Sequence, residues 1–227
     1  MDTPYKTGLP HYPSTLRNRR FILDVLKVHL PSCGFILETA SGSGEHIAYF
    51  GEQCPNIDWL PSDRSDILFW AVKKRILGKK NILDPIKIDL TDLQPLYNKV
   101  QCDGIINTNM THISPWGATQ GLFRLAKAVL KPNGFILIYG PFKIKGRHIS
   151  VSNKMFHEQL LEEDSSWGVR DMDQIVELAK EWGFSFLKMH CGVAALRRGA
   201  QPPAHLLSWR LLSGPRARAR PVLGQGN

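Results

Sequence analysis

The most informative part of the sequence for the fold is FILETASGSGEHIAYF, residues 35–50. It starts as an apolar run, passes through a turn of small residues, and then resumes with apolar residues at helical spacing. This order predicts a buried strand, a glycine turn and a helix. Such a turn presents free backbone N–H groups and a helix N-terminus to a ligand. The same residues would also suit a tight turn packed for its own sake.

Strand-like and helix-like segments alternate on both sides of this stretch. Apolar runs predict further strands at residues 57–60, 85–90, 103–107, 135–139 and 184–189. Helical periodicity and capping residues predict helices at residues 14–30, 45–53, 66–77, 114–130, 152–163 and 171–183. Most strands are continuous apolar runs, which is typical of a parallel sheet covered on both faces. We therefore expect an α/β fold, a doubly wound Rossmann-like sandwich with a mainly parallel sheet.

Two kinds of cofactor compete for the glycine turn. A dinucleotide fingerprint, G-x-G-x-x-G, needs a third glycine, but counting from Gly42 places Ile47 there. The turn of S-adenosylmethionine sites is typically acidic-x-small-x-Gly-x-Gly. That pattern matches Glu38, Ala40, Gly42 and Gly44. The turn therefore favours S-adenosylmethionine over NAD or FAD, and Glu38 suits the positive end of that ligand, directly or through water.

Acidic residues also close the next two predicted strands. Asp63 can accept hydrogen bonds from both ribose hydroxyls, although a turn aspartate is the simpler interpretation of that residue alone. Asp89 can accept from the adenine amino group, or Leu90 can offer its backbone N–H to the ring. Asp89 equally suits a cap of the following turn. Together, the three acids predict an adenosyl site at the C-terminal edge of the sheet.

The ends of the fourth and fifth strands should meet the same edge. Asn107 and Asn109 are candidates to anchor the methionine end or the acceptor. His112 is the candidate general base, and a buried imidazole with a structural role is the alternative. The residues that we expect to form the wall of the acceptor pocket are aromatic: Trp116, Tyr139 and Phe142.

These segments resemble the methyltransferase-like protein 26 family. The resemblance rests on ETASGSGEH, LPSD, NMTHISPW, LKPNG, YGPF and WGVRD, and it covers roughly residues 12–190. It implies a class I methyltransferase fold and S-adenosylmethionine as cofactor, but no substrate. The Arg-Asn pair of the family also implies that Arg17 and Asn18 fold over the cofactor mouth. Taken alone, these two residues equally suit a solvated helix face.

The chain departs from the family pattern after Met189. Residues 192–227 are rich in Arg, Pro and Gly and contain no acid. We expect a methyltransferase-like domain at residues 1–191, followed by a disordered basic tail in which LLSWRLL forms at most a helical turn. The tail looks like an alternative C-terminus, as from splicing or a shifted reading frame. We therefore expect the usual seventh strand to be missing.

Charge and composition narrow the function. The net charge of +9 belongs largely to the tail, because residues 1–191 carry 23 Lys and Arg against 20 Asp and Glu. This disfavours nucleic-acid partners for the body. We expect a methyltransferase acting on a small-molecule acceptor, or a cofactor-binding protein without catalysis, which a missing strand would favour. Methylation of nucleic acid or protein and an oxidoreductase are weaker alternatives.

Several further features set the expected surroundings of the protein. The four cysteines are widely spaced and fit no metal site, and the N-terminus has no apolar core typical of a secretory signal. Nor does the chain contain an apolar run long enough to span a membrane. These features predict a protein of the cytoplasm, and of the nucleus as a second place, without a metal. The oligomeric state has no signal in the sequence.

Overall fold

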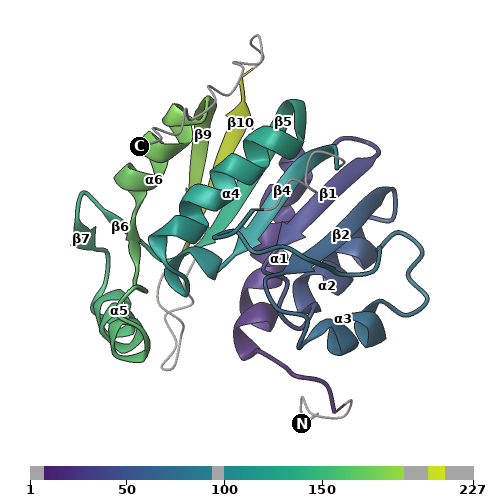
Figure 1. Ribbon diagram of the computed structural model, residues 1–227, viewed down its shortest axis with the longest axis horizontal. Helices are drawn as coiled ribbons and strands as arrows, with labels where there is room; N and C mark the ends of the chain where they lie inside the picture. The colour runs from purple at the N-terminus through teal and green to yellow at the C-terminus, as the bar shows by residue number, and fades with distance from the viewer. Residues whose placement is uncertain (1–7, 94–99, 192–203, 213–227) are drawn as a thin grey trace, which may run out of the picture.

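The computed structural model describes residues 8–93, 100–191 and 204–212. Its centre is a seven-stranded sheet with the order β3-β2-β1-β4-β5-β10-β9 (Figure 1). The sheet strands are β1 (Gly34–Thr39), β2 (Ile57–Asp63), β3 (Ile86–Lys87), β4 (Cys102–Thr108), β5 (Leu130–Gly140), β9 (Phe184–Cys191) and β10 (His205–Leu211). The first five are parallel to one another, whereas β10 is antiparallel to both β5 and β9. The doubly wound, mostly parallel sheet is therefore confirmed.

Helices cover both faces of the sheet because its strands are apolar on both sides. Neighbouring strand residues point to opposite faces: Leu37 packs with α4 and α6, and Ile36 packs with α1, α2 and α3. Figure 1 shows α4 in front of the sheet and α1 behind it. The helices are α1 (Pro13–His29), α2 (Glu45–Gln53), α3 (Phe69–Ile76), α4 (Trp116–Val129), α5 (Val151–Glu163) and α6 (Met172–Glu181).

The strand that we expected to be missing is present. Strand β10, from the basic tail, lies between β5 and β9 and pairs with both along its length. Its side chains alternate between the two faces: Leu207 and Trp209 join the core under α4 and α6, and Leu206 joins the opposite core. Trp209 is fully buried between the rings of Phe123 and Phe186.

Two sequence expectations about the tail are therefore wrong for residues 204–212. This stretch is neither disordered nor a helical turn, because alternating apolar residues fill a two-sided slot that only a strand can occupy. The disorder that we expected for residues 192–203 and 213–227 lies outside the described residues. The boundaries also shift at β3, which has only two residues where the sequence predicted six.

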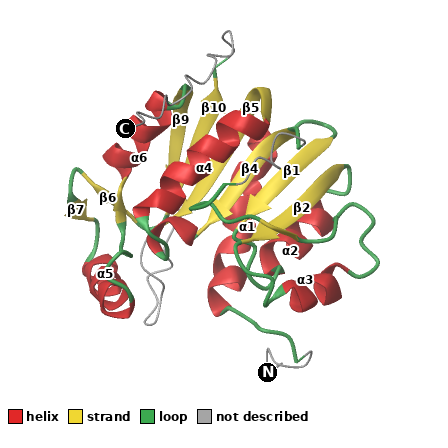
Figure 2. Cartoon of the chain, viewed as in Figure 1, coloured by secondary structure: helices red, strands yellow, loops and turns green. Residues whose placement is uncertain are grey.

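A small second unit follows β5. Strands β6 (Phe142–Ile144), β7 (Arg147–His148) and β8 (Arg170–Asp171) form a three-stranded sheet, and α5 lies between β7 and β8 in the chain. Figure 2 shows this unit beside the sheet edge that carries α6. The short 3-10 helix η2 (Met110–His112) follows β4. Among the described residues, no helix combines the length and apolar character that crossing a membrane requires.

Candidate functional site

The glycine turn joins β1 to α2 with three left-handed residues. Ala40, Gly42 and Gly44 have φ values of 56°, 53° and 79°. For Ala40 this conformation is strained, at a cost on the order of 1–3 kcal/mol, and such strain concentrates at functional sites. A Cβ at Gly44 would lie 3.1 Å from the backbone of Val72, so close packing requires glycine there. A Cβ at Gly42 would meet open space, because this residue faces a cavity.

That cavity has a volume of about 560 Å³ and lies at the C-terminal ends of β1, β2 and β4. Its size is typical of small-molecule and cofactor sites. The predicted site residues that line it come from four separate segments of the chain: Ala40, Gly42, Asp63, Asp89, Leu90, Asn109 and His112. These residues therefore lie together at the C-terminal edge of the sheet, and their role in binding a cofactor stays a prediction.

Asp63 connects the end of β2 to the glycine turn. Its Oδ2 accepts a hydrogen bond from the Gly42 N–H at 3.0 Å, and its Oδ1 accepts from the Ser65 N–H at 3.3 Å. The carboxylate thus fixes the turn and also borders the cavity. An ionised carboxylate has about four acceptor sites, so two remain for a ligand. Both interpretations of Asp63, turn residue and ligand contact, are compatible with this geometry.

Asp89 and Leu90 border the same cavity beyond β3. The Oδ1 atom of Asp89 accepts from the N–H and the hydroxyl of Thr91 at 2.8 and 2.6 Å, and the hydroxyl contact lowers the pKa of this carboxyl. Asp89 therefore does cap the following turn, and it also borders the cavity. Leu90 is held from behind by α4, because a Cβ on Gly121 would come within 1.7 Å of the Leu90 carbonyl oxygen.

Glu38 does not border the cavity. It is 2% exposed, and its Oε2 has no hydrogen-bond partner among the described residues. Burial raises the pKa of the carboxyl to about 8; the Ser41 hydroxyl opposes this rise, and the negative charge of Asp63 adds to it. Glu38 is therefore protonated near neutral pH and lies beneath the turn. Asn107 is also buried beneath the turn, where its amide donates to the Thr39 hydroxyl at 2.9 Å.

His112 borders the cavity as a neutral imidazole. Burial, and then the positive charge of Arg170, lowers its pKa to about 3. Its Nδ1 is buried against Gly140 and has no hydrogen-bond partner in the described part of the chain. The Phe156 ring packs against it edge-on, with centroids 5.5 Å apart. A base with so low a pKa removes protons weakly, so His112 is better suited to orienting a bound molecule by hydrogen bonding.

The five residues expected around the acceptor do not border the cavity: Arg17, Asn18, Trp116, Tyr139 and Phe142. Asn18 Oδ1 instead accepts a hydrogen bond from His46 Nε2 at 2.8 Å, and so joins α1 to α2. Trp116 packs under the guanidinium of Arg170, and Phe142 is 1% exposed in the core. Arg17 is exposed on α1, whereas Asn18, Tyr139 and Phe142 are buried in the helix–sheet layers away from the cavity.

Other aromatic residues take their place at this end of the cavity. Phe156 comes from α5, and Trp167 comes from the loop that precedes β8. The loop is fixed next to the site because the Gly168 N–H donates to the His112 carbonyl at 2.9 Å. Trp167 opens the WGVRD motif, but no sequence pattern placed either residue at the cavity, since both lie more than 40 positions from the fourth strand. Their contribution follows from the small β6–β8 unit folding back over η2.

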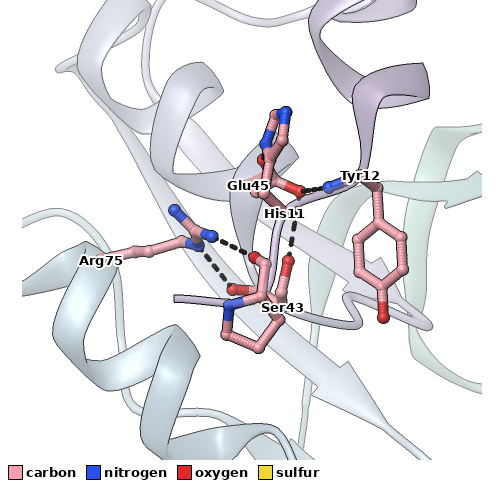
Figure 3. A network of polar contacts seen from close by, with 6 residues as sticks. His11, Tyr12, Ser43, Glu45 and Arg75 are labelled. Atoms are coloured by element: carbon pink, nitrogen blue, oxygen red, sulfur yellow. Dashed lines mark hydrogen bonds and ion pairs between the residues drawn. The ribbon is translucent and has the colours of Figure 1, made fainter. Parts of the chain in front are cut away.

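The first turn of α1 and the residue before it also border the cavity, and no sequence pattern predicted this. Tyr12, Ser14 and Thr15 contribute to the lining. Glu45, the first residue of α2, holds this segment through His11 and the Tyr12 N–H, as Figure 3 shows. These partners are more than 30 residues apart in the chain, so local sequence patterns cannot reveal them. No group of three or more metal-ligating side chains occurs within residues 8–93, 100–191 and 204–212.

Comparisons with known proteins agree with this architecture. The model of a family described as a protein of unknown function, DUF938, matches residues 10–191. An O-methyltransferase family protein from Burkholderia thailandensis has a similar structure, with a TM-score of 0.71 at 15% identity over 89% of this chain and 58% of that one. Human N-acetylserotonin methyltransferase, solved with S-adenosylmethionine, matches with a TM-score of 0.67 at 17% identity over 88% and 53%.

A third structure, CalO1, a methyltransferase of calicheamicin biosynthesis solved with S-adenosylhomocysteine, matches with a TM-score of 0.62. It is 12% identical over 86% of this chain and 54% of that one. The chain thus spans a little more than half the length of these three proteins. At such low identities the likeness shows a shared methyltransferase fold.

Proposed function

The chain belongs to the DUF938 family, in agreement with the motifs that resemble methyltransferase-like protein 26, and we propose that it is an S-adenosylmethionine-dependent methyltransferase of small molecules. One observation carries the proposal: Gly42, Asp63 and Asp89, from three successive strand ends, border one cavity. That arrangement suits an adenosyl group, which lies along the C-terminal edge of a parallel sheet and contacts protein groups there through its ribose, its adenine and the backbone of the glycine turn.

The residues present fit this cofactor. The backbone at Gly42 is open to the cavity, so a ligand can approach the turn closely. Asp63 would accept from the ribose hydroxyls, and Asp89 or the Leu90 N–H would meet the adenine. Asn109, which lies just beyond β4 with φ of 64°, would face the methionine end or the acceptor. The cofactor supplies a methyl group on a sulfonium that is already activated.

The chain's own residues then have to position the acceptor and exclude water. Correct alignment of two reactants can contribute roughly 7–11 kcal/mol. The acceptor end is bordered by Phe156, Trp167 and the neutral His112, which suits an uncharged or aromatic small molecule. A near-neutral body speaks against long contacts with nucleic-acid phosphates. The N-acetylserotonin enzyme named above methylates a small molecule on the same fold, which supports this choice.

A cofactor-binding protein without catalysis is the second candidate. Its original support, a missing seventh strand, is removed by β10. The weak basicity of His112 still favours it, because no other histidine of the cavity stands at the acceptor end. Incubation with labelled methyl donor and a metabolite extract separates the two. Labelled product supports the enzyme, and binding without any product supports the silent protein.

Calorimetric titration with S-adenosylmethionine and S-adenosylhomocysteine tests the cofactor assignment. We expect binding at one site per chain. Asp63→Ala should weaken it roughly ten- to a hundredfold, the value of one or two charged hydrogen bonds. Asp58→Ala is the matched control, because Asp58 lies on the same strand but is exposed. Absence of binding to the unaltered protein, or equal binding by the Asp63 and Asp58 variants, would refute the assignment.

A further inference from the structure

Glu45 is a cavity-bordering carboxylate to which the adenosyl site assigns no role. Its side chain is 10% exposed and lies at the first position of α2, directly after the glycine turn. Its Oε1 contacts His11 Nδ1 at 2.6 Å, and its Oε2 accepts from the Tyr12 N–H at 2.8 Å and the Ser43 hydroxyl at 3.3 Å. Figure 3 shows these contacts converging on one carboxylate.

This carboxylate still has capacity for a ligand. An ionised carboxylate offers about four acceptor sites, and the three contacts above leave one. Its place is also fixed, because Arg75 donates to the carbonyls of Ser43 and Pro10 and so fastens the turn and the N-terminal segment together. Glu45 is therefore a prepositioned negative group at the edge of the cavity.

The cofactor has one group that needs such a partner. S-adenosylmethionine carries a protonated amino group at its amino-acid end, and a cation that leaves water needs a carboxylate or other acceptors. Within the described part of the chain, three carboxylates border the cavity: Glu45, Asp63 and Asp89. Asp63 and Asp89 stand at the ends of β2 and beyond β3, on the side of the ribose and adenine. Glu45 adjoins Tyr12, Ser14 and Thr15 instead.

The acidic residue of the glycine motif does not suit this role. Glu38 lies beneath the turn, outside the cavity lining, and burial favours its protonated form. A protonated carboxyl that does not reach the cavity cannot balance the charge of a bound ammonium. The structure thus separates the residue that the motif marks from the residue that faces the ligand.

We propose that Glu45 binds the ammonium group of the cofactor's amino-acid end, in the place that the glycine motif would give to Glu38. This inference rests on the proposed function, since it names a contact within the same site. It also links the ligand to the chain's N-terminal segment, because the carboxylate that receives the ammonium holds His11 and Tyr12 as well. Binding of the ligand therefore stabilises residues 10–15 against the cavity.

Two ligands isolate this contact. S-adenosylhomocysteine carries the amino-acid end, whereas 5′-methylthioadenosine has the same adenosyl part without it. Glu45→Gln keeps the shape of the side chain but removes its charge. We expect this change to weaken S-adenosylhomocysteine at least tenfold and to leave 5′-methylthioadenosine within twofold. If Glu45 lay beside the ligand's carboxylate instead, removing its negative charge would strengthen S-adenosylhomocysteine binding. A selective loss of affinity for S-adenosylhomocysteine therefore identifies the ammonium group as the partner of Glu45.

Three further variants complete the calorimetric series. Glu52→Gln, on the exposed side of α2 and paired with Lys79, is the matched control and should bind both ligands as the unaltered protein does. Glu38→Gln should not reproduce the selective loss. His11→Ala removes the contact to the N-terminal segment but leaves the carboxylate, so it should retain most of the affinity for S-adenosylhomocysteine.

The outcomes separate this inference from the proposed function. If 5′-methylthioadenosine and S-adenosylhomocysteine both fail to bind the unaltered protein, the adenosyl site itself is refuted. If both bind and Glu45→Gln weakens them equally or not at all, only the role of Glu45 is refuted. The role of Glu45 is also refuted if His11→Ala or Glu38→Gln selectively weakens S-adenosylhomocysteine, because the carboxylate of Glu45 is intact in both variants.

Discussion

Replacing Glu38 with glutamine should remove a pH dependence of stability that this one carboxyl causes. Burial raises the pKa of Glu38 from 4.5 to about 8 in the folded protein. Between these two values the unfolded chain carries an ionised carboxylate and the folded chain a protonated one. The stability that Glu38 contributes is therefore complete below pH 4.5 and is lost as the pH rises through 8.

The size of the effect follows from that window. Each pH unit inside it changes the free energy of unfolding by about 1.4 kcal/mol, so the interval from pH 5.5 to 7.5 corresponds to about 2–3 kcal/mol. Burial lowers the pKa values of His46 and His112 to about 4 and about 3, which gives the opposite slope below pH 6.5. Both histidines are present in both proteins, so their contribution cancels in the difference.

Urea unfolding at pH 5.5, 6.5 and 7.5 measures this difference. The unaltered protein should lose about 2–3 kcal/mol relative to Glu38→Gln over this interval, with no change in the dependence on urea concentration. Asp58→Asn, an exposed carboxylate on β2, serves as the control and should follow the unaltered protein. Parallel pH profiles for the unaltered protein and Glu38→Gln would refute the buried, protonated state of Glu38.

Two further predictions concern the framework of the site. Gly121→Ala should lower the free energy of unfolding by about 1–3 kcal/mol and weaken S-adenosylhomocysteine binding, because its Cβ would displace the Leu90 carbonyl. Gly117→Ala is the control, because a Cβ at this residue would meet open space. In thermal unfolding and calorimetry, Gly117→Ala should behave nearly as the unaltered protein does. Trp209→Ala should lower the free energy of unfolding, measured in urea, by about 3–5 kcal/mol, because Trp209 is fully buried. Arg210→Ala, at an exposed residue of the same strand, should lower it by less than about 0.5 kcal/mol. Equal values within either pair would contradict the packing described.

Local sequence patterns predicted the parts of the fold that local physics determines. The apolar run, small turn and helix of residues 35–50 form β1, the left-handed turn and α2, with α2 at the predicted residues. Asp63 and Asp89 reached one cavity because the C-terminal ends of parallel strands meet at one edge of a sheet. A pattern of strand ends therefore located this part of the candidate site.

The rest depends on contacts between distant segments. The motif marked Glu38, yet the alternation of β1 turns that side chain beneath the turn. Likewise, LLSWRLL lies beyond residues 10–191, which the family model matches, and it is a strand because it pairs with both β5 and β9. The pairing of Glu45 with His11 spans 34 residues. Such contacts cannot be inferred from the composition of the chain or from the spacing of its residues.

A crystal structure of the protein grown with S-adenosylhomocysteine tests the central claim most directly. We expect the ligand in the cavity above the glycine turn, with its ribose hydroxyls on Asp63, its adenine beside Leu90 and its ammonium on Glu45. The central claim would be contradicted by a ligand bound elsewhere, or by a cavity that stays empty at saturating ligand.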